Sequence, residues 1–131
     1  MSIDTIGDFL TIIRNGRMVS KPSVVAPYSR VKHAIADILK SEGFIRGCEV
    51  IENTSGKKVL KLSLKYVNGE SVIHEITRKS TPGLRVYTGS RTIKPVIGGL
   101  GLSIITTSRG LLTHKKAKEL GVGGEVICTV W

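Results

Sequence analysis

Residues 102–110, with the sequence LSIITTSRG, combine an apolar run with a polar cluster. Residues 102–105 are a short apolar run that predicts a buried strand. Residues 106–110 follow at the point where that strand is expected to end in a loop or a helix. They offer three hydroxyls, a guanidinium and a glycine that a ligand can approach closely. This polar platform suits sugars, phosphates and base edges better than bond-breaking chemistry.

Charge indicates which of these ligands is favoured. The 131-residue chain carries a net charge of +10 and has a pI near 10.0. Residues 76–118 contain nine Lys and Arg residues and no Asp or Glu. Such an excess attracts phosphate and releases counterions on binding, so the pattern favours nucleic acid over an ordinary lysine-rich surface.

Composition limits the other classes of function. The length allows one compact unit or two small halves. No run approaches the 18 apolar residues of a membrane span and no signal peptide is recognisable, so we expect a cytoplasmic or organellar-matrix protein without a membrane partner. Cys48 and Cys128 are far apart in sequence without a CxxC spacing or a neighbouring histidine cluster, which predicts no metal site and no disulfide. Aromatic residues make up 5% of the chain, which argues against binding by stacked rings.

Two amphipathic helices are predicted in the N-terminal half. Asp4 is expected to cap the first, which residues 14–17 are expected to end. Ser29 is expected to cap the second, and Gly43 to close it. The apolar stripe of the second helix is expected to comprise Val31, Ala34, Ile35, Ile38 and Leu39.

Strands are predicted at residues 23–28, 44–51, 58–67 and 71–77. The first is expected at a sheet edge because Pro22 and Pro27 flank it. Asn68 and Gly69 predict a two-residue hairpin between the last two strands. This order predicts a small sheet covered on one face by both helices.

Past the hairpin the pattern changes to short strands. Residues 82–83 predict a turn, and the glycine-rich run 97–101 lacks the third glycine of a dinucleotide-binding loop. Thr113 is expected to cap a helix of about two turns that ends before Gly121. A final strand is expected at residues 126–131, with Val126, Cys128 and Val130 on one buried face.

Several basic side chains have two open interpretations. Arg14, near the end of the first helix, either meets a phosphate or favours the negative helix end. Arg30 and Lys32 oppose the dipole of the second helix, which hints at an anion, although a solvated face is favoured. Lys115 and Lys116 have the wrong sign for the start of their helix, so either a phosphate compensates or they point to water.

Glu125 is the unusual acid of this basic region. It either accepts hydrogen bonds from base amino groups or pairs inside the protein with Arg109 or a backbone N–H, and an internal or mixed role is favoured. Catalysis is unsupported, because the histidines are scattered and Ser108 has no recognisable base or nucleophile elbow.

Several separated blocks occur in an order that resembles the bacterial small-subunit ribosomal protein of the eighth family. They are residues 82–87 (PGLRVY), 99–101 (GLG), 106–113 (TTSRGLLT) and 121–128 (GVGGEVIC), with 12–15 (IIRN) and 40–44 (KSEGF) nearer the start. Two positions depart from the family pattern. Thr106 stands where serine is usual and keeps a hydroxyl, whereas His114 replaces a frequent aspartate and leaves the capping of its helix open.

The resemblance implies an α+β protein of two domains that acts without catalytic residues, cofactor or metal. Residues 1–68 would form an α/β part with two helices on a small three-stranded sheet. Residues 69–131 would form a mainly β, RNA-binding part with one short helix.

The resemblance also implies a structural constituent of the small ribosomal subunit that is monomeric within the ribosome. It would bind the central domain of small-subunit ribosomal RNA and help to assemble the platform, beside small-subunit proteins of the fifth and twelfth families. The alternative is a general basic nucleic-acid chaperone. RNA contact is carried over to Tyr87, Thr106, Thr107, Ser108, Arg109, Gly110, Gly123, Gly124 and Glu125. Further candidates are Arg85, Arg14, Arg30, Lys32, Lys115 and Lys116.

Overall fold

A computed structural model describes residues 4–89 and 101–131. The chain divides into two compact units, Asp8–Ile73 and Met1–Gly7 together with His74–Trp131. Helices and antiparallel sheets occur in both parts of the sequence, which confirms the predicted α+β class. The predicted domain boundary after residue 68 stays a prediction. None of the helices in the described ranges is long and apolar enough to cross a membrane.

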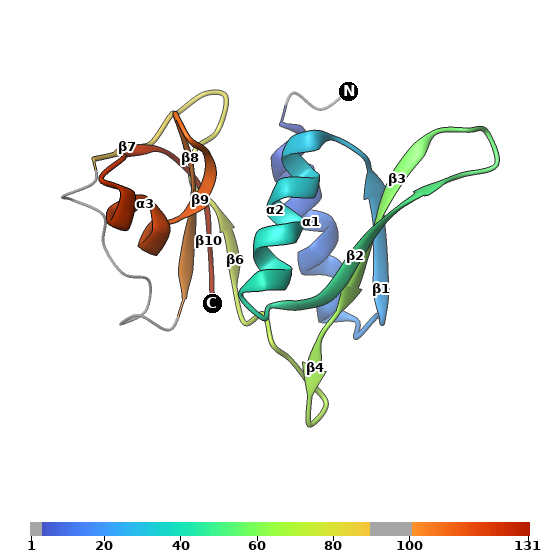
Figure 1. Cartoon of the computed structure of the whole chain (residues 1–131). Helices are drawn as coiled ribbons and strands as arrows, with labels where there is room; N and C mark the ends of the chain where they lie inside the picture. Colours follow the sequence, from blue (N-terminus) through green and yellow to red (C-terminus); the bar gives the residue numbers. More distant parts are fainter. Residues whose placement is uncertain (1–3, 90–100) are drawn as a thin grey trace. The chain divides into compact units, whose positions relative to one another are not determined.

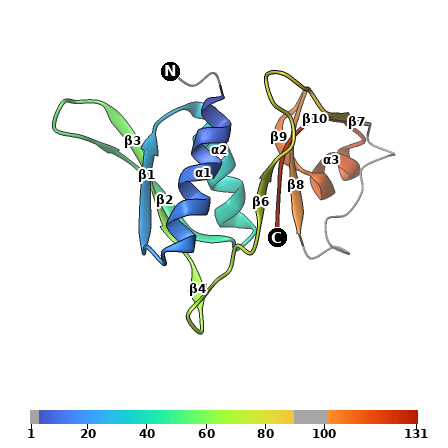
Figure 2. The same cartoon turned by 180° about the vertical axis from the view of Figure 1, so that it is seen from behind.

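The Asp8–Ile73 unit contains an antiparallel three-stranded sheet in the order β1, β3, β2. Its strands are β1 (Ser23–Pro27), β2 (Ile45–Glu52) and β3 (Lys58–Leu64). Strand β1 lies at an edge, as its flanking prolines predict, and β3 lies at the centre. Figures 1 and 2 show helices α1 (Thr5–Met18) and α2 (Arg30–Ser41) side by side on one face of this sheet, which confirms the predicted layering.

Helix α1 begins as predicted but ends later. The Asp4 carboxylate accepts a hydrogen bond from the Gly7 backbone N–H at 3.1 Å, which is the bond of an N-cap. The helix continues to Met18 instead of ending within residues 14–17. Gly16 lies inside it and is buried, and a side chain at this position would collide with Val24 of β1. The glycine therefore allows the helix to pack closely against the sheet.

Helix α2 has the predicted caps but a different buried face. The Ser29 hydroxyl accepts from the Lys32 N–H at 3.1 Å, and Gly43 follows the helix with a φ of +80°. The buried residues are Lys32, Ile35, Ala36 and Leu39, whereas Val31 is 43% exposed. The predictions for Val31 and for the solvated position of Lys32 are therefore wrong, since the buried stripe lies one residue further round the helix.

The predicted hairpin at Asn68 and Gly69 is confirmed, but its second strand is short. Strands β4 (Tyr66–Val67) and β5 (Glu70–Ser71) pair around these two residues, whose φ angles are 52° and 81°. Two positive φ angles are what a type I′ turn requires. The predicted strand at 71–77 is wrong as a single element, because β6 (Ile76–Arg78) is separate and pairs with β10.

The second unit is built on an antiparallel sheet in the order β6, β10, β8, β9, with β7 also pairing with β10. Its remaining elements are β7 (Tyr87–Thr88), β8 (Leu102–Thr107), β9 (Gly110–Thr113), α3 (His114–Leu120) and β10 (Gly124–Val130). The predicted strand at 102–105 and the predicted short helix before Gly121 are both confirmed. Residues 90–100, which include most of the glycine-rich run, lie outside the described residues.

A β-bulge in β10 changes which side chains share a face. The register shifts between Val126, which pairs with Ile105, and Cys128, which pairs with Ile104. Because cross-strand partners lie on the same face, Val126 and Cys128 point to opposite faces. The predicted common face of Val126, Cys128 and Val130 is therefore wrong for Val126. Ile104 and Ile105 are both fully buried, so β8 is covered on both sides.

Candidate nucleic-acid interface

Residues 106–110 form the tip of a β-hairpin, so the strand ends in a short turn, as one of the two predicted alternatives has it, and not in a helix. Thr107 pairs with Gly110 across a turn made by Ser108 and Arg109, and Gly110 has a φ of +95°. The Thr107 hydroxyl accepts from the Arg109 N–H at 3.0 Å and donates to the Gly110 carbonyl at 2.8 Å. Thr107 therefore fixes the turn, while the side chains of Ser108 and Arg109 are exposed at its tip.

The three separated segments that the sequence singled out lie on neighbouring strands. In β10, Gly124 is opposite Thr107 of β8 and Thr88 of β7. Glu125 is likewise opposite Thr106 and Tyr87. The fold thus brings Tyr87, the hairpin tip and the Gly-Gly-Glu segment into one surface, which we call the hairpin surface. Tyr87 is 70% exposed on it.

Gly123 and Gly124 are required by strand packing. A Cβ on Gly123 would collide with the Thr88 carbonyl and lie 2.8 Å from the Gly89 Cα. A Cβ on Gly124 would collide with the Thr106 carbonyl and lie 3.2 Å from the Thr107 Cα. These two glycines therefore let β7, β10 and β8 approach one another, which is a role within the protein.

Glu125 is held inside the protein, but not by the partner predicted. Its carboxylate accepts hydrogen bonds from the Ser80 hydroxyl and, at 3.0 Å, from Arg85. Ser80 and Arg85 are thus the side-chain partners of Glu125, whereas the sequence suggests Arg109. The Ser80 bond, together with the ion pair to Arg85, holds the pKa of Glu125 below its ordinary value although burial opposes the shift. Glu125 therefore anchors the segment that leads into Tyr87.

Ser80 is a functional neighbour that sequence reasoning missed. Its side chain is fully buried, and its hydroxyl also accepts from the Val86 N–H at 3.2 Å. The Val86 carbonyl in turn accepts from the Val126 N–H at 2.8 Å. These bonds fix the backbone directly before Tyr87. No spacing rule links Ser80 to a carboxylate 45 residues later, so only the fold reveals the pair.

The capping of helix α3 does not depend on an acid at position 114. The Thr113 hydroxyl accepts from the Lys116 N–H at 3.2 Å, as an N-cap should. His114 is buried, and its Nδ1 accepts a hydrogen bond from the Ser103 N–H at 3.1 Å. Histidine at this position therefore joins the helix to β8, and Lys115 and Lys116 remain exposed beside it.

The other predicted basic residues belong to the Asp8–Ile73 unit. Arg30 is exposed, Arg14 is half-buried and Lys32 is 7% exposed. Burial of the alkyl stem explains how a lysine can occupy the apolar side of α2. Lys32 is consequently the least accessible of all the predicted RNA contacts.

The three histidines lie in separate surroundings: two make packing contacts and one belongs to a small polar cluster. His74 stacks on Trp131 with ring centroids 5.2 Å apart, and His114 accepts from β8 as described. His33 lies beside Asp37 and Cys48, although the sequence predicted no metal site near either cysteine. Burial and the hydrogen bond to Asp37 raise the pKa of the Cys48 thiol.

Together, the fold and the hairpin surface define a basic α+β class of protein, with the side chains of Ser108 and Arg109 exposed at the hairpin tip. The chain matches the model of the family "Ribosomal protein S8" over residues 4–131, and it belongs to that family, whose members are structural and not enzymatic. The predicted family and the predicted absence of enzymatic activity are thereby confirmed.

Similar proteins from several bacteria share the name "Small ribosomal subunit protein uS8". The chain is 54% identical to the one from Acidovorax sp. (strain JS42) over 127 residues, which cover 97% of this chain and 96% of the relative. It is 52% identical to that from Verminephrobacter eiseniae with the same coverage. It is 53% identical to that from Moorella thermoacetica over 129 residues, 98% of each chain.

Proposed function

We propose that this protein is a structural constituent of the small ribosomal subunit that binds ribosomal RNA through the hairpin surface. The observation that carries the proposal is the strand register, which sets Tyr87 and Thr106 on either side of Glu125 beside the exposed Ser108–Arg109 tip. A-form RNA presents a shallow minor groove with 2′-hydroxyls and phosphates. Hydroxyl side chains can donate to or accept from such a sugar, and Arg109 can bind a phosphate at two points.

The residues of the surface have different roles in this proposal. Ser108, Arg109, Thr106 and Tyr87 contact RNA directly, since their side chains are exposed or half-exposed. Thr107, Gly110, Gly123 and Gly124 shape the surface, and Arg85 and Glu125 hold the segment before Tyr87. Lys115 and Lys116 add positive potential from α3. Arg14, Arg30 and Lys32 are secondary candidates, and Lys32 is the least exposed of the three.

The printed names of the relatives and the family resemblance support a particular setting for this activity. In that setting the protein is a monomer in bacterial cytoplasm that binds the central domain of small-subunit ribosomal RNA and helps to assemble the platform. Small-subunit proteins of the fifth and twelfth families are its proposed neighbours. Residues 69–131 carry the principal RNA contacts in this scheme, and residues 1–68 act mainly as scaffold.

Filter binding to a central-domain RNA fragment tests the proposal. Ser108→Ala should weaken binding by about 1 kcal/mol, the typical net contribution of one hydrogen bond. The matched control is Ser41→Ala, which removes an exposed hydroxyl at the end of α2 in the other unit. If Ser108→Ala binds the cognate RNA as tightly as Ser41→Ala does, and the two variants also discriminate equally against a mutated helix, the hairpin tip is not the contact.

A salt titration separates specific recognition from general attraction. Lys115→Ala should reduce the slope of log K against log salt by about 1 without changing the preference for the cognate helix. A general nucleic-acid chaperone would instead bind cognate and scrambled fragments alike in competition. That result would favour the chaperone and remove the proposed specific role.

A further inference from the structure

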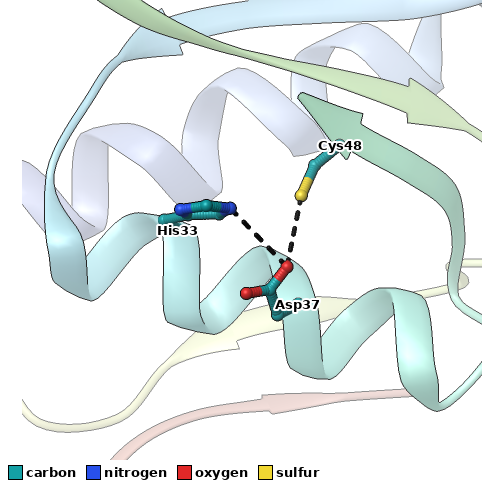
Figure 3. A group of neighbouring side chains, drawn as sticks. All are labelled: His33, Asp37 and Cys48. Carbon is teal, nitrogen blue, oxygen red and sulfur yellow. Dashed lines mark hydrogen bonds and ion pairs between the residues drawn. The ribbon is translucent and has the colours of Figure 1, made fainter. Parts of the chain in front are cut away.

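The Asp8–Ile73 unit carries a compact cluster of three potential metal ligands of different chemistry. Figure 3 shows His33 and Asp37 on α2 facing Cys48 of β2. His33 Nε2 lies 3.7 Å from Asp37 Oδ1, and Cys48 Sγ lies 3.5 Å from the same oxygen. The ligand atoms of all three residues lie within 4.8 Å of one another.

These separations resemble the edges of a tetrahedral site. With metal bonds of about 2.0 to 2.3 Å, the ligand atoms of a tetrahedral Zn²⁺ site lie about 3.3 to 3.8 Å apart. Both distances to Asp37 Oδ1 already fall in this range. The remaining pair, His33 and Cys48, lies within 4.8 Å, and a small change in the side-chain torsions of His33 or Cys48 would bring it into the same range.

Helix and strand fix the backbone positions of the three donors. His33 and Asp37 are four residues apart on α2, which places them one above the other on the same helix face. Strand β2 packs against that helix and presents Cys48. The Tyr28 ring meets the His33 ring edge to face, with centroids 5.9 Å apart, and His33 Nε2 faces Asp37.

The donor set selects the class of ion. A thiolate is a poor ligand for Mg²⁺ or Ca²⁺, whereas a nitrogen, sulfur and oxygen set suits Zn²⁺. The Cys48 thiol donates a hydrogen bond to the Asp37 carboxylate, and a bound cation would take the place of that proton between the same two atoms. Since the His33 side chain is 34% exposed, water can reach a fourth position.

We propose that His33, Asp37 and Cys48 form a binding site for a divalent transition ion of the zinc class. Imidazole Nε2, one carboxylate oxygen and the thiolate sulfur supply three ligands, and water supplies the fourth. None of these residues belongs to the hairpin surface, so the site stands independently of the proposed RNA contacts.

Co²⁺ titration of the purified, reduced, full-length chain tests this site, because Co²⁺ replaces Zn²⁺ in such sites and is coloured. One equivalent should produce a sulfur-to-cobalt charge-transfer band and the intense visible bands of tetrahedral Co²⁺. One equivalent of Zn²⁺ should abolish both. Cys48→Ala should remove the charge-transfer band, and His33→Ala should weaken Co²⁺ binding at least tenfold, since losing a direct ligand should exceed the effect of losing an outer-shell partner.

Each variant has a control elsewhere in the chain. Cys128→Ala removes the other thiol, which is fully buried, and His74→Gln removes an imidazole that stacks on Trp131. Both should keep the spectrum and affinity of the unchanged protein, and far-UV circular dichroism should show that all four variants are folded. If one of the Cys variants does not fold, the comparison of Co²⁺ affinity between His33→Ala and His74→Gln tests the site by itself. No charge-transfer band, or a band that survives in Cys48→Ala, would overturn the proposal.

Discussion

Replacing Gly124 with alanine should force strands β10 and β8 apart beside the hairpin tip. The added Cβ would collide with the Thr106 carbonyl oxygen and lie 2.9 Å from the carbonyl carbon. These are backbone atoms, which cannot turn away as a flexible side chain can. Relief therefore requires the loss of ladder hydrogen bonds around the pair of Gly124 and Thr107.

The expected magnitude follows from those lost bonds. Each buried backbone group left unpaired costs about 1 to 3 kcal/mol, so leaving one donor and one acceptor unpaired should destabilise the unit by about 2 to 6 kcal/mol. With an m-value of about 2 kcal/mol/M in urea, the unfolding midpoint should fall by about 1 to 3 M.

Tryptophan fluorescence during urea unfolding reports the stability of the structural unit that contains Gly124. Trp131 is the single tryptophan and belongs, like Gly124, to the unit containing His74–Trp131. Gly83→Ala is the matched control, because a Cβ there meets nothing within 4 Å, and its free energy of unfolding should change by less than about 0.5 kcal/mol. Equal midpoints for Gly124→Ala and Gly83→Ala would refute the close approach of the strands.

Three other predictions concern acid, thiols and a helix end. The pKa of Glu125 and that of Asp4, where hydrogen bonds from Arg78 and Gly7 outweigh burial, lie below their ordinary values of 4.5 and 3.8. The stability that both carboxylates contribute is therefore present above these values and is lost as pH falls through the folded pKa. The urea concentration at the unfolding midpoint should therefore decrease when the pH is lowered below about 4.5, and Glu125→Gln should make this decrease smaller. Burial raises the pKa of Cys128 to about 12, so a thiol reagent should label only Cys48 in the folded chain and both cysteines in denaturant; rapid double labelling of folded protein would contradict this. Gly121→Ala, at a φ of +71°, should cost about 1 to 2 kcal/mol in the same urea assay, and an unchanged midpoint would be inconsistent with that backbone angle.

Local signals in the sequence predicted much of the fold because they depend on neighbouring residues. Ser29 and Thr113 cap helices through their own hydroxyls, and Asn68 with Gly69 supplies the two positive φ angles of a tight turn. Strand β9 was missed because four residues give too little pattern to separate a strand from a loop. The continuation of α1 through Gly16 was missed because a glycine usually signals a helix end, whereas here it is buried in the helix beside Val24, a contact that no local pattern contains.

The candidate sites show the same limit more sharply. The residue types of the hairpin surface could be predicted from hydroxyl, glycine and basic clusters, but the partners of Glu125 could not. Ser80 and Arg85 reach it only after β7 and β10 pair. Likewise, Cys48 of β2 contacts Asp37 of α2 only in the folded protein. A search for regular cysteine and histidine spacing in the sequence therefore does not find this cluster.

The hydrogen bonds of Thr107 have a kinetic consequence for any ligand of the hairpin tip. Because the hydroxyl already closes the turn from both sides, little backbone entropy remains to be lost when a partner docks. Encounters should therefore succeed without a folding step, and substitutions at Ser108 should shorten the lifetime of a complex more than they slow its formation.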